Sequence, residues 1–405
     1  MAGQSPLSLM QGERQRMVRR APPVAAPRRA RRLWPIVLPI AAIVLLAAGW
    51  CGAWYYAASV SARTLQGWVA READAGRHYT CGSEGIGGFP LWIEAHCRAA
   101  AATLVSPAGT PLSLAAQEIV FTAEVYRPTL LTGDVTAPLT VSAPGQPPSL
   151  VANWTLARIS VSGLPPDPDA LSITIAQPHL SDGASAGART LFAADGADFQ
   201  ARIVSGSPAD QPVIDAVLHF TSATAPTIHP LLAQALQGDI EMVVSGFRNL
   251  SPKPIAEYFR EMHSAGGHIE IKSFRIARAD AVVVGSGTLT VNEHGRLDGM
   301  LNIAVSGMDN IVPLLGIDKL IGQGINQLTG ANGSAAQGLS ALDRLLPGLS
   351  GVVRNSANAS VIDDLKKMGQ PTEIDHKPAT ALPLRFADGS VYLGMIRLGT
   401  VPALF

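Results

Sequence analysis

The chain has 405 residues, of which 47% are hydrophobic, and its formal net charge is zero. This composition excludes a mainly disordered protein and is sufficient for one large domain or two smaller ones. The charge is unevenly spread, because the first 32 residues hold eight of the 31 basic residues and only one acid, Glu13. The remainder is therefore acidic, which argues against nucleic-acid binding.

The first predicted element is the segment 33–56, which contains no charged residue. Its 24 residues would form about 36 Å of helix, enough to cross a hydrocarbon layer about 30 Å thick. The positive-inside rule then places the arginine-rich tail, residues 1–32, in the cytoplasm. Four arginines of this tail lie closest to the helix: Arg28, Arg29, Arg31 and Arg32. We expect a single-pass protein of the cell inner membrane, with inner-membrane lipids as partners and the bulk of the chain in the periplasm.

A cleaved signal peptide is the alternative, because Val60-Ser61-Ala62 could serve as a small-residue cleavage site. The apolar run exceeds the roughly 7–15 residues of a signal peptide's apolar region, which favours a retained anchor. Cys51 follows the large residue Trp50. We therefore interpret Cys51 as a membrane-embedded thiol rather than as a lipid-modified cysteine.

Residues 57–76 show helical periodicity and are expected to continue the membrane helix as a stalk or as a docking helix. Cys81 and Cys97 follow, in what would be an oxidising compartment, where an isolated pair usually forms a disulfide. Such a bond would stabilise the fold by about 3 kcal/mol. A metal site with His78 and His96 is the rival interpretation, but the spacing matches no zinc motif. We predict neither a metal nor another cofactor.

Short strand-like runs recur between residues 77 and 405, separated by proline, glycine and aspartate, and they favour an antiparallel sheet over βαβ units. The predicted strands of the first half are 112–121, 136–141, 150–161, 171–176, 199–204 and 213–221. Helical patterns at 228–236 and 253–263 suggest a boundary between two lobes near 226–267.

Strands are again predicted in the last third, at 268–277, 281–291 and 297–305. Residues 308–367 have the pattern of small amphipathic helices that would cover the sheet. Asp388-Gly389 is typical of a hairpin turn. The predicted fold class is α+β, mainly β, with an N-terminal transmembrane helix and a large antiparallel β-rich periplasmic domain with a few covering helices.

Two motifs resemble a known family. Gly88-Phe89-Pro90-Leu91 stands before the second cysteine, and residues 382–394 read LPLRFADGSVYLG. With the N-terminal anchor, they resemble the domain of unknown function 2125 (DUF2125) family of Gram-negative envelope proteins over residues 35–405. Residues 287–299 more weakly resemble AsmA-like proteins, which are associated with outer-membrane lipid homeostasis. This second resemblance implies a lipid connection by analogy.

Candidate catalytic groups are few. Residues 183–187 match the G-x-S-x-G nucleophile elbow, but Ser185 is preceded by loop sequence rather than by the strand that the elbow requires. His263 and His268 are the closest histidine pair and belong to no zinc motif. Three acids could supply a catalytic carboxylate pair: Glu118, Glu124 and Asp134. The simpler interpretation is that they lie on solvated faces of strands.

These features together predict a non-enzymatic, membrane-anchored periplasmic protein that binds lipid or another apolar ligand in envelope maintenance. A structural or assembly scaffold that binds another envelope protein is the first alternative. An anchored hydrolase that uses Ser185 is the second.

Overall fold

The computed structural model describes residues 34–74, 76–105, 110–164, 167–183, 187–228, 230–311, 363, 366–394 and 396–405. The chain divides into two compact units, residues 1–53 and residues 54–405. The first unit contains the beginning of helix α1. The second contains the rest of this helix and the whole of the β-sheet.

Helix α1, Trp34–Asp74, is continuous over 41 residues and joins the predicted span to the predicted stalk or docking helix. By length and composition, Val37–Asp74 is a candidate membrane span. Within the second unit the helix contacts the first strands of the sheet. The ring of Trp68 lies 5.0 Å from that of Tyr79, and Arg77 donates a hydrogen bond of 2.9 Å to Glu72. The part of α1 after residue 53 is therefore a docking helix.

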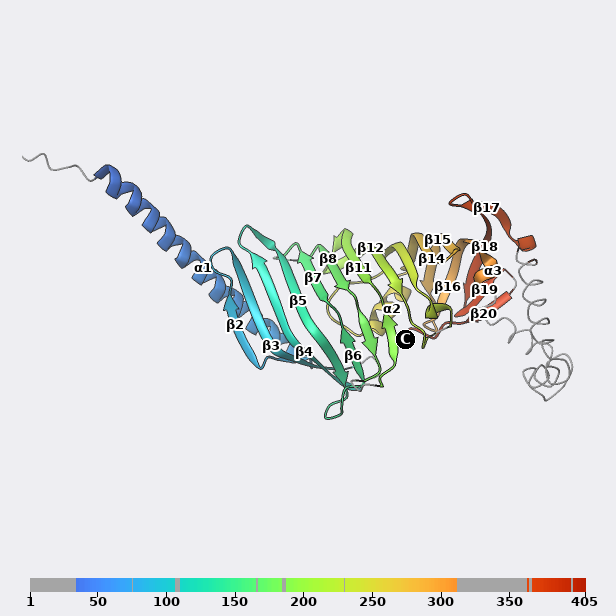
Figure 1. Cartoon of the computed structure of the whole chain (residues 1–405), viewed down its shortest axis with the longest axis horizontal. Coiled ribbons are helices and arrows are strands. Elements are labelled where there is room, and N and C mark those ends of the chain that lie inside the picture. The colour runs from blue at the N-terminus through green and yellow to red at the C-terminus, as the bar shows by residue number, and fades with distance from the viewer. Residues whose placement is uncertain are drawn as a thin grey trace, which may run out of the picture. The chain divides into compact units, whose positions relative to one another are not determined.

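A sheet of 20 antiparallel strands forms most of the second unit (Figure 1). The first twelve strands are β1 His78–Thr80, β2 Ser83–Gly87, β3 Trp92–Val105, β4 Pro111–Glu124, β5 Arg127–Ser142, β6 Leu150–Asn153, β7 Leu156–Ser162, β8 Ala170–Ala176, β9 His179–Ser181, β10 Thr190–Ala193, β11 Gly196–Ser207 and β12 Asp210–Ala223.

The remaining strands alternate with short helices. These elements are the 3-10 helix η1 Pro230–Ala233, β13 Leu236–Val244, α2 Ile255–Ser264, β14 Ile269–Arg278, β15 Ala281–Val291, β16 Leu297–Ser306, α3 Met308–Ile311, β17 Gln370–Ile374, β18 Lys377–Ala387, β19 Ser390–Leu393 and β20 Ile396–Thr400. The predicted fold class, mainly β with one long apolar helix and few others, is confirmed.

The strands pair largely in chain order. The hydrogen-bonded order is β2–β3–β4–β5–β7–β8–β11–β12–β13–β14–β15–β16–β18–β19–β20. Strands β6, β9 and β10 form a side branch that leaves the far end of β5. Antiparallel neighbours need only short turns, which explains the proline- and glycine-rich punctuation of the sequence.

The prediction of one strand over 150–161 is wrong, because this segment forms two strands. β6 pairs with residues 139–141 of β5, whereas β7 pairs with residues 130–134. Trp154 lies between them, and its indole N–H donates a 2.7 Å hydrogen bond to the carbonyl of Val135. A partly buried indole N–H usually finds a hydrogen-bond partner. That partner lies on another strand and is invisible in the local sequence.

A helix at 228–236 is likewise not observed. A 3-10 turn occupies Pro230–Ala233, and β13 begins at Leu236 and pairs with both β12 and β14. Strand β13 therefore joins β12 to β14 in a segment that we expected to be helical at its beginning. Gly238, Asp239 and Glu241 lower the strand propensity of β13, which conceals its alternation. The predicted helix at 253–263 corresponds to α2.

The predicted covering helices at 308–367 lie mostly outside the described residues. The structure shows α3 at the beginning of this segment, where it contacts β15, as α2 does. The principal core lies beside these contacts, between β15, β16, β18, β19 and α3. It consists of Leu289, Leu301, Ile303, Val305, Met308, Leu382 and Leu393.

Three phenylalanines each face a glycine on the neighbouring strand. The pairs are Phe121 with Gly133, Phe220 with Gly238, and Phe274 with Gly285. A Cβ atom added at Gly238 would lie 2.3 Å from Cζ of Phe220, and one at Gly285 would lie 2.8 Å from Cε1 of Phe274. Each ring therefore lies over its glycine and covers the backbone that the missing side chain would leave exposed.

Replacing Gly238 with valine is predicted to destabilise the sheet by about 2 kcal/mol, because the ring of Phe220 must leave its position. Gly85→Val is the matched control, since a Cβ atom at this strand glycine meets nothing within 4 Å. The measurement is urea unfolding of the full chain in detergent, followed by circular dichroism of the sheet. Equal losses in the two variants would contradict the proposed ring packing.

One largely buried ion pair holds helix α2. The ammonium of Lys253 lies 2.7 Å from both carboxylate oxygens of Glu261, and each side chain is about one-tenth exposed. The backbone N–H of Arg248 also donates to Glu261, at 3.2 Å. Burial by itself raises the pKa of Glu261, but the hydrogen bonds from Lys253 and Arg248 outweigh it and hold this pKa below its ordinary value.

Lys253→Met is predicted to cost about 3 kcal/mol near neutral pH, since it leaves a buried carboxylate unpaired. A carboxyl with a lowered folded pKa stabilises the fold above its unfolded pKa, about 4.3, and loses this effect as the pH falls through the folded pKa. The loss should therefore shrink below about pH 4. Unfolding of the variant in urea at several pH values measures it.

The double variant with Lys253→Met and Glu261→Leu is the control, because it removes both charges. It is expected to recover most of the loss seen with Lys253→Met. A double variant as unstable as the single one at neutral pH would show that the ion pair is not the cause.

Candidate functional site

The register of the sheet places an uninterrupted row of non-polar residues on one side. Directly opposite residues of neighbouring strands point to the same face. We call this row of 13 residues, one from each of 13 strands, the apolar row: Ile86, Ala95, Phe121, Gly133, Ile159, Ile173, Phe199, Leu218, Ile240, Phe274, Gly285, Ile303 and Leu382. The face that carries it is called the apolar face.

A second row on the same face is equally non-polar. It contains Ile93, Ala123, Leu131, Val161, Leu171, Ala201, Ala216 and Met242. Neighbouring strands are about 4.8 Å apart, so the apolar row extends on the order of 58 Å along the sheet. That length exceeds the thickness of a bilayer's hydrocarbon core, about 30 Å.

The two ends of the apolar row differ in exposure. Ile86, Phe121 and Ile159, in the first strands, are each 37% exposed to solvent. Ile303 and Leu382, in the last strands, are 8% and 3% exposed and belong to the core. The apolar face is thus closed at its C-terminal end and accessible at its N-terminal end.

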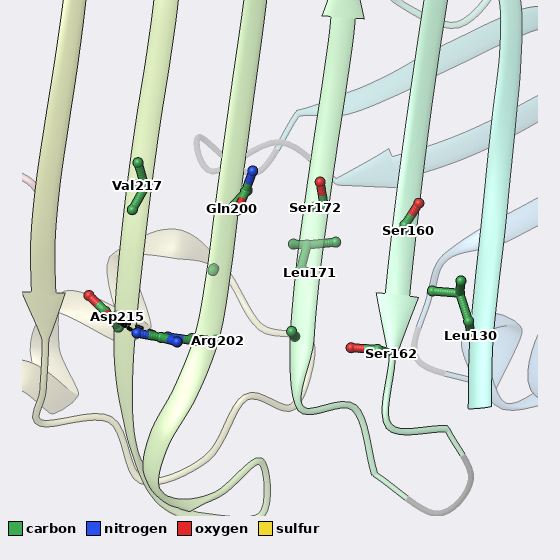
Figure 2. A pocket seen from close by; sticks show the side chains of 11 residues that line it. Leu130, Ser160, Ser162, Leu171, Ser172, Gln200, Arg202, Asp215 and Val217 are labelled. Atoms are coloured by element: carbon green, nitrogen blue, oxygen red, sulfur yellow. Dashed lines mark hydrogen bonds and ion pairs between the residues drawn. The ribbon is translucent and has the colours of Figure 1, made fainter. Parts of the chain in front are cut away.

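The opposite face of the sheet is mainly polar from β3 to β13. A row there reads Glu94, Thr122, Thr132, Ser160, Ser172, Gln200, Val217 and Glu241. It crosses a shallow hollow of about 430 Å³, which Figure 2 shows from close by. The hollow is lined by Leu130, Ser160, Ser162, Ala170, Ser172, Gln200, Arg202, Asp215 and Val217. Leu171 and Ala201 also line it, although the register assigns their side chains to the apolar face.

The two charged residues that line this hollow, Arg202 and Asp215, bind each other, and Lys272 from a neighbouring strand joins them. The guanidinium of Arg202 lies 2.8 Å from one carboxylate oxygen of Asp215, and the ammonium of Lys272 lies 3.2 Å from the other. The hydrogen bond from Arg202, followed by that from Lys272, lowers the pKa of Asp215. The lining includes serine hydroxyls but neither histidine nor cysteine, so it offers no pair of serine nucleophile and histidine base.

The structure joins Cys81 and Cys97 in a disulfide, with Cα atoms 5.3 Å apart. The bond connects the segment between β1 and β2 to the middle of β3. The nearby motif Gly88-Phe89-Pro90 forms the turn between β2 and β3. Gly88 has φ +95°, and a Cβ atom there would lie 2.5 Å from Cδ1 of Trp92. A side chain at position 88 would therefore prevent this turn.

The second motif, Asp388-Gly389, forms the turn between β18 and β19. Both residues have positive φ, 46° and 73°. The side-chain amide of Asn292 donates to Asp388 at 3.1 Å, and Arg296 donates to the Asp388 carbonyl at 3.1 Å. Residues nearly 100 positions apart are thereby brought together, and the turn is fixed to the one between β15 and β16.

The other sequence candidates contact different partners. His263 faces the carbonyl of Val291 at 2.9 Å, whereas His268 faces the hydroxyl of Ser245 at 3.3 Å. Glu118 pairs with His96 and Arg98, whose hydrogen bonds lower its pKa. Asp134 pairs with Arg158 at 2.7 Å, and Glu124 ends β4 opposite Trp92.

Within the described ranges, no three His, Cys, Asp or Glu side chains are grouped so as to hold a metal ion. Arg28, Arg29, Arg31, Arg32 and Ser185 lie outside the described residues, so their predicted roles stay predictions.

Sequence reasoning missed the apolar row. The local sequence shows only that apolar and polar residues alternate within single strands. Which residues of neighbouring strands stand opposite each other depends on strand pairing.

A family model described as an uncharacterised protein conserved in bacteria (DUF2125) matches residues 54–402. Neither a curated protein nor a solved structure matches the chain significantly. The weaker likeness to AsmA-like proteins therefore has no support among these comparisons. The matched region includes the disulfide, both turn motifs and every strand of the sheet, and the chain belongs to the DUF2125 family.

Proposed function

We propose that this chain is a non-enzymatic protein of the bacterial inner membrane, whose periplasmic sheet binds lipid or another elongated apolar ligand on its apolar face. The observation that carries the proposal is the row of non-polar side chains that remains accessible over the first strands. Water does not favour such a surface, and contiguous apolar patches on proteins usually mark a binding site.

The shape of the face supports an extended ligand. Phe121 and Phe274 lie over Gly133 and Gly285, so their rings cover the sheet without standing away from it. The long, low apolar surface that results fits a hydrocarbon chain better than a compact polar molecule. The closed end around Leu382 would limit how far such a chain extends.

The location rests on two further features. Helix α1 is a candidate span, and the arginines before it favour a cytoplasmic N-terminus. The disulfide Cys81–Cys97 favours an oxidising compartment, which in a bacterium with an outer membrane is the periplasm. The polar face, with its paired charged groups, is suited to contact with water.

A photoreactive benzophenone amino acid at position 159 is predicted to crosslink to lipid in cells, because Ile159 is an exposed member of the apolar row. Position 160 is the matched control, since Ser160 is the next residue of β7 and lines the hollow on the polar face. Mass spectrometry of the peptide identifies the adduct. If position 159 forms adducts with one protein and none with lipid, the result would instead favour the alternative function, a scaffold that binds another envelope protein.

Alkaline phosphatase fused after Phe405 is predicted to be active, because this enzyme needs the periplasm for its disulfides. Replacing Arg28, Arg29, Arg31 and Arg32 with glutamate should reduce the activity, since it removes the charge bias next to the span. A fluorescent protein that folds only in the cytosol serves as the reciprocal reporter. Cytosolic fluorescence without phosphatase activity would overturn the proposed topology.

A further inference from the structure

Three chain segments meet at one edge of the second unit. The ring of Trp54, in α1, lies edge-on to that of Phe89, with centroids 5.5 Å apart. The indole N–H of Trp54 donates a 3.0 Å hydrogen bond to the carbonyl of Trp92. The N–H of Val125, in the turn between β4 and β5, donates to the carbonyl of Leu91 at 3.0 Å. Helix and turns thus form one connected surface.

We call this surface the aromatic edge. Its exposed members are Phe89, Leu91, Trp92, Val125 and Tyr126 on the two turns, together with Tyr55 and Tyr56, which follow Trp54 on α1. Four of these side chains are more than half exposed, with values of 74% for Tyr55, 68% for Tyr56, 64% for Tyr126 and 53% for Phe89. The segments 54–56, 88–92 and 125–126 contain no charged residue. So many exposed rings in one place exceed the scattered apolar residues of an ordinary protein surface.

The aromatic edge is held firmly in shape. The N–H of Trp92 donates to the carbonyl of Gly88 at 3.1 Å, which closes the turn that carries Phe89. The disulfide fixes β3 a few residues further along. The rings are therefore presented outward by a rigid turn and do not depend on a loose loop to expose them.

We infer that the aromatic edge lies in the headgroup region of the same membrane that α1 enters, so that the first strands of the sheet rest on the bilayer surface. The chain itself points to this occupant. The predicted span, residues 33–56, ends with Trp54, Tyr55 and Tyr56, so its boundary falls at the aromatic edge. Tryptophan and tyrosine prefer this depth, because one side of each ring is apolar and the other carries a polar group.

Membrane contact at the aromatic edge would affect access to the apolar face. Ile86 and Phe121 lie on β2 and β4, the strands whose turns form the aromatic edge. Contact with the bilayer would place the open end of the apolar row beside membrane lipids. The inference rests on the proposed insertion of α1, but it does not depend on ligand binding by the sheet.

The test uses the full chain in nanodiscs of phosphatidylethanolamine and phosphatidylglycerol, with Cys51→Ser as background. Cys81 and Cys97 are disulfide-bonded and do not react with thiol dyes. One environment-sensitive dye is attached to a cysteine at position 89, 126, 146 or 45 in turn. The nanodiscs contain lipids with a nitroxide quencher on the headgroup or on the acyl chain.

Dyes at positions 89 and 126 are expected to shift to shorter emission wavelengths and to lose fluorescence to headgroup nitroxides. Position 146, in the exposed turn after β5, should keep its fluorescence. Two positions at the aromatic edge keep the test valid if one substitution disturbs the fold. Circular dichroism of each labelled protein verifies the sheet.

Position 45 separates the two proposals, because Leu45 lies in the middle of the apolar segment of α1. If acyl-chain nitroxides quench position 45 while positions 89 and 126 behave like position 146, the aromatic edge does not contact the membrane and the inference is wrong. If position 45 is not quenched either, the anchor itself fails.

Discussion

The cross-strand register of the antiparallel sheet is the constraint on which the rest of this structure depends. Side chains alternate between the two faces of a strand, so a slip of one residue would exchange the faces completely. From β3 to β13 the register keeps most aliphatic and phenyl side chains on one side, and most hydroxyls, carboxylates and guanidinium groups on the other. In the last strands the other side carries a small hydrophobic cluster of its own, with Ala277, Val282, Ile374 and Ala379. A sheet register that buries one face is strongly determined, because any alternative places charge in an apolar surface.

Irregularities in the sheet preserve this segregation. Between Ile271 and Phe274, strand β14 contains one residue more than its partner β15. This bulge keeps both residues on the apolar face, although an odd number of positions separates them. Glycine has a related role. Gly133, Gly238 and Gly285 give space to the phenyl rings opposite them, so large residues cover the sheet without being forced apart.

The two faces consequently have different physical roles. On the polar face, Asp134, Asp215 and Glu118 each have a basic partner, which accounts for their charge without a catalytic function. On the apolar face, the exposure of the side chains changes along the sheet, from a closed core near Leu382 to exposed side chains near Ile86. The accessible part of this apolar surface is costly in water, and a lipid partner would remove that cost. The docking of α1 connects this surface to the segment proposed to enter the membrane.

The sequence by itself determined the long apolar helix, the mainly antiparallel β class, the helix α2 and the cysteine pair Cys81–Cys97, since each depends on local periodicity, on composition or on a short loop. Turn chemistry also identified Asp388-Gly389. Only the tertiary structure decided that the segment 150–161 is interrupted at Trp154, that residues 236–244 form a strand, and that the apolar row exists. These features depend on which strands become neighbours and in which register. Pairing joins residues that are far apart along the chain, and no local pattern records it.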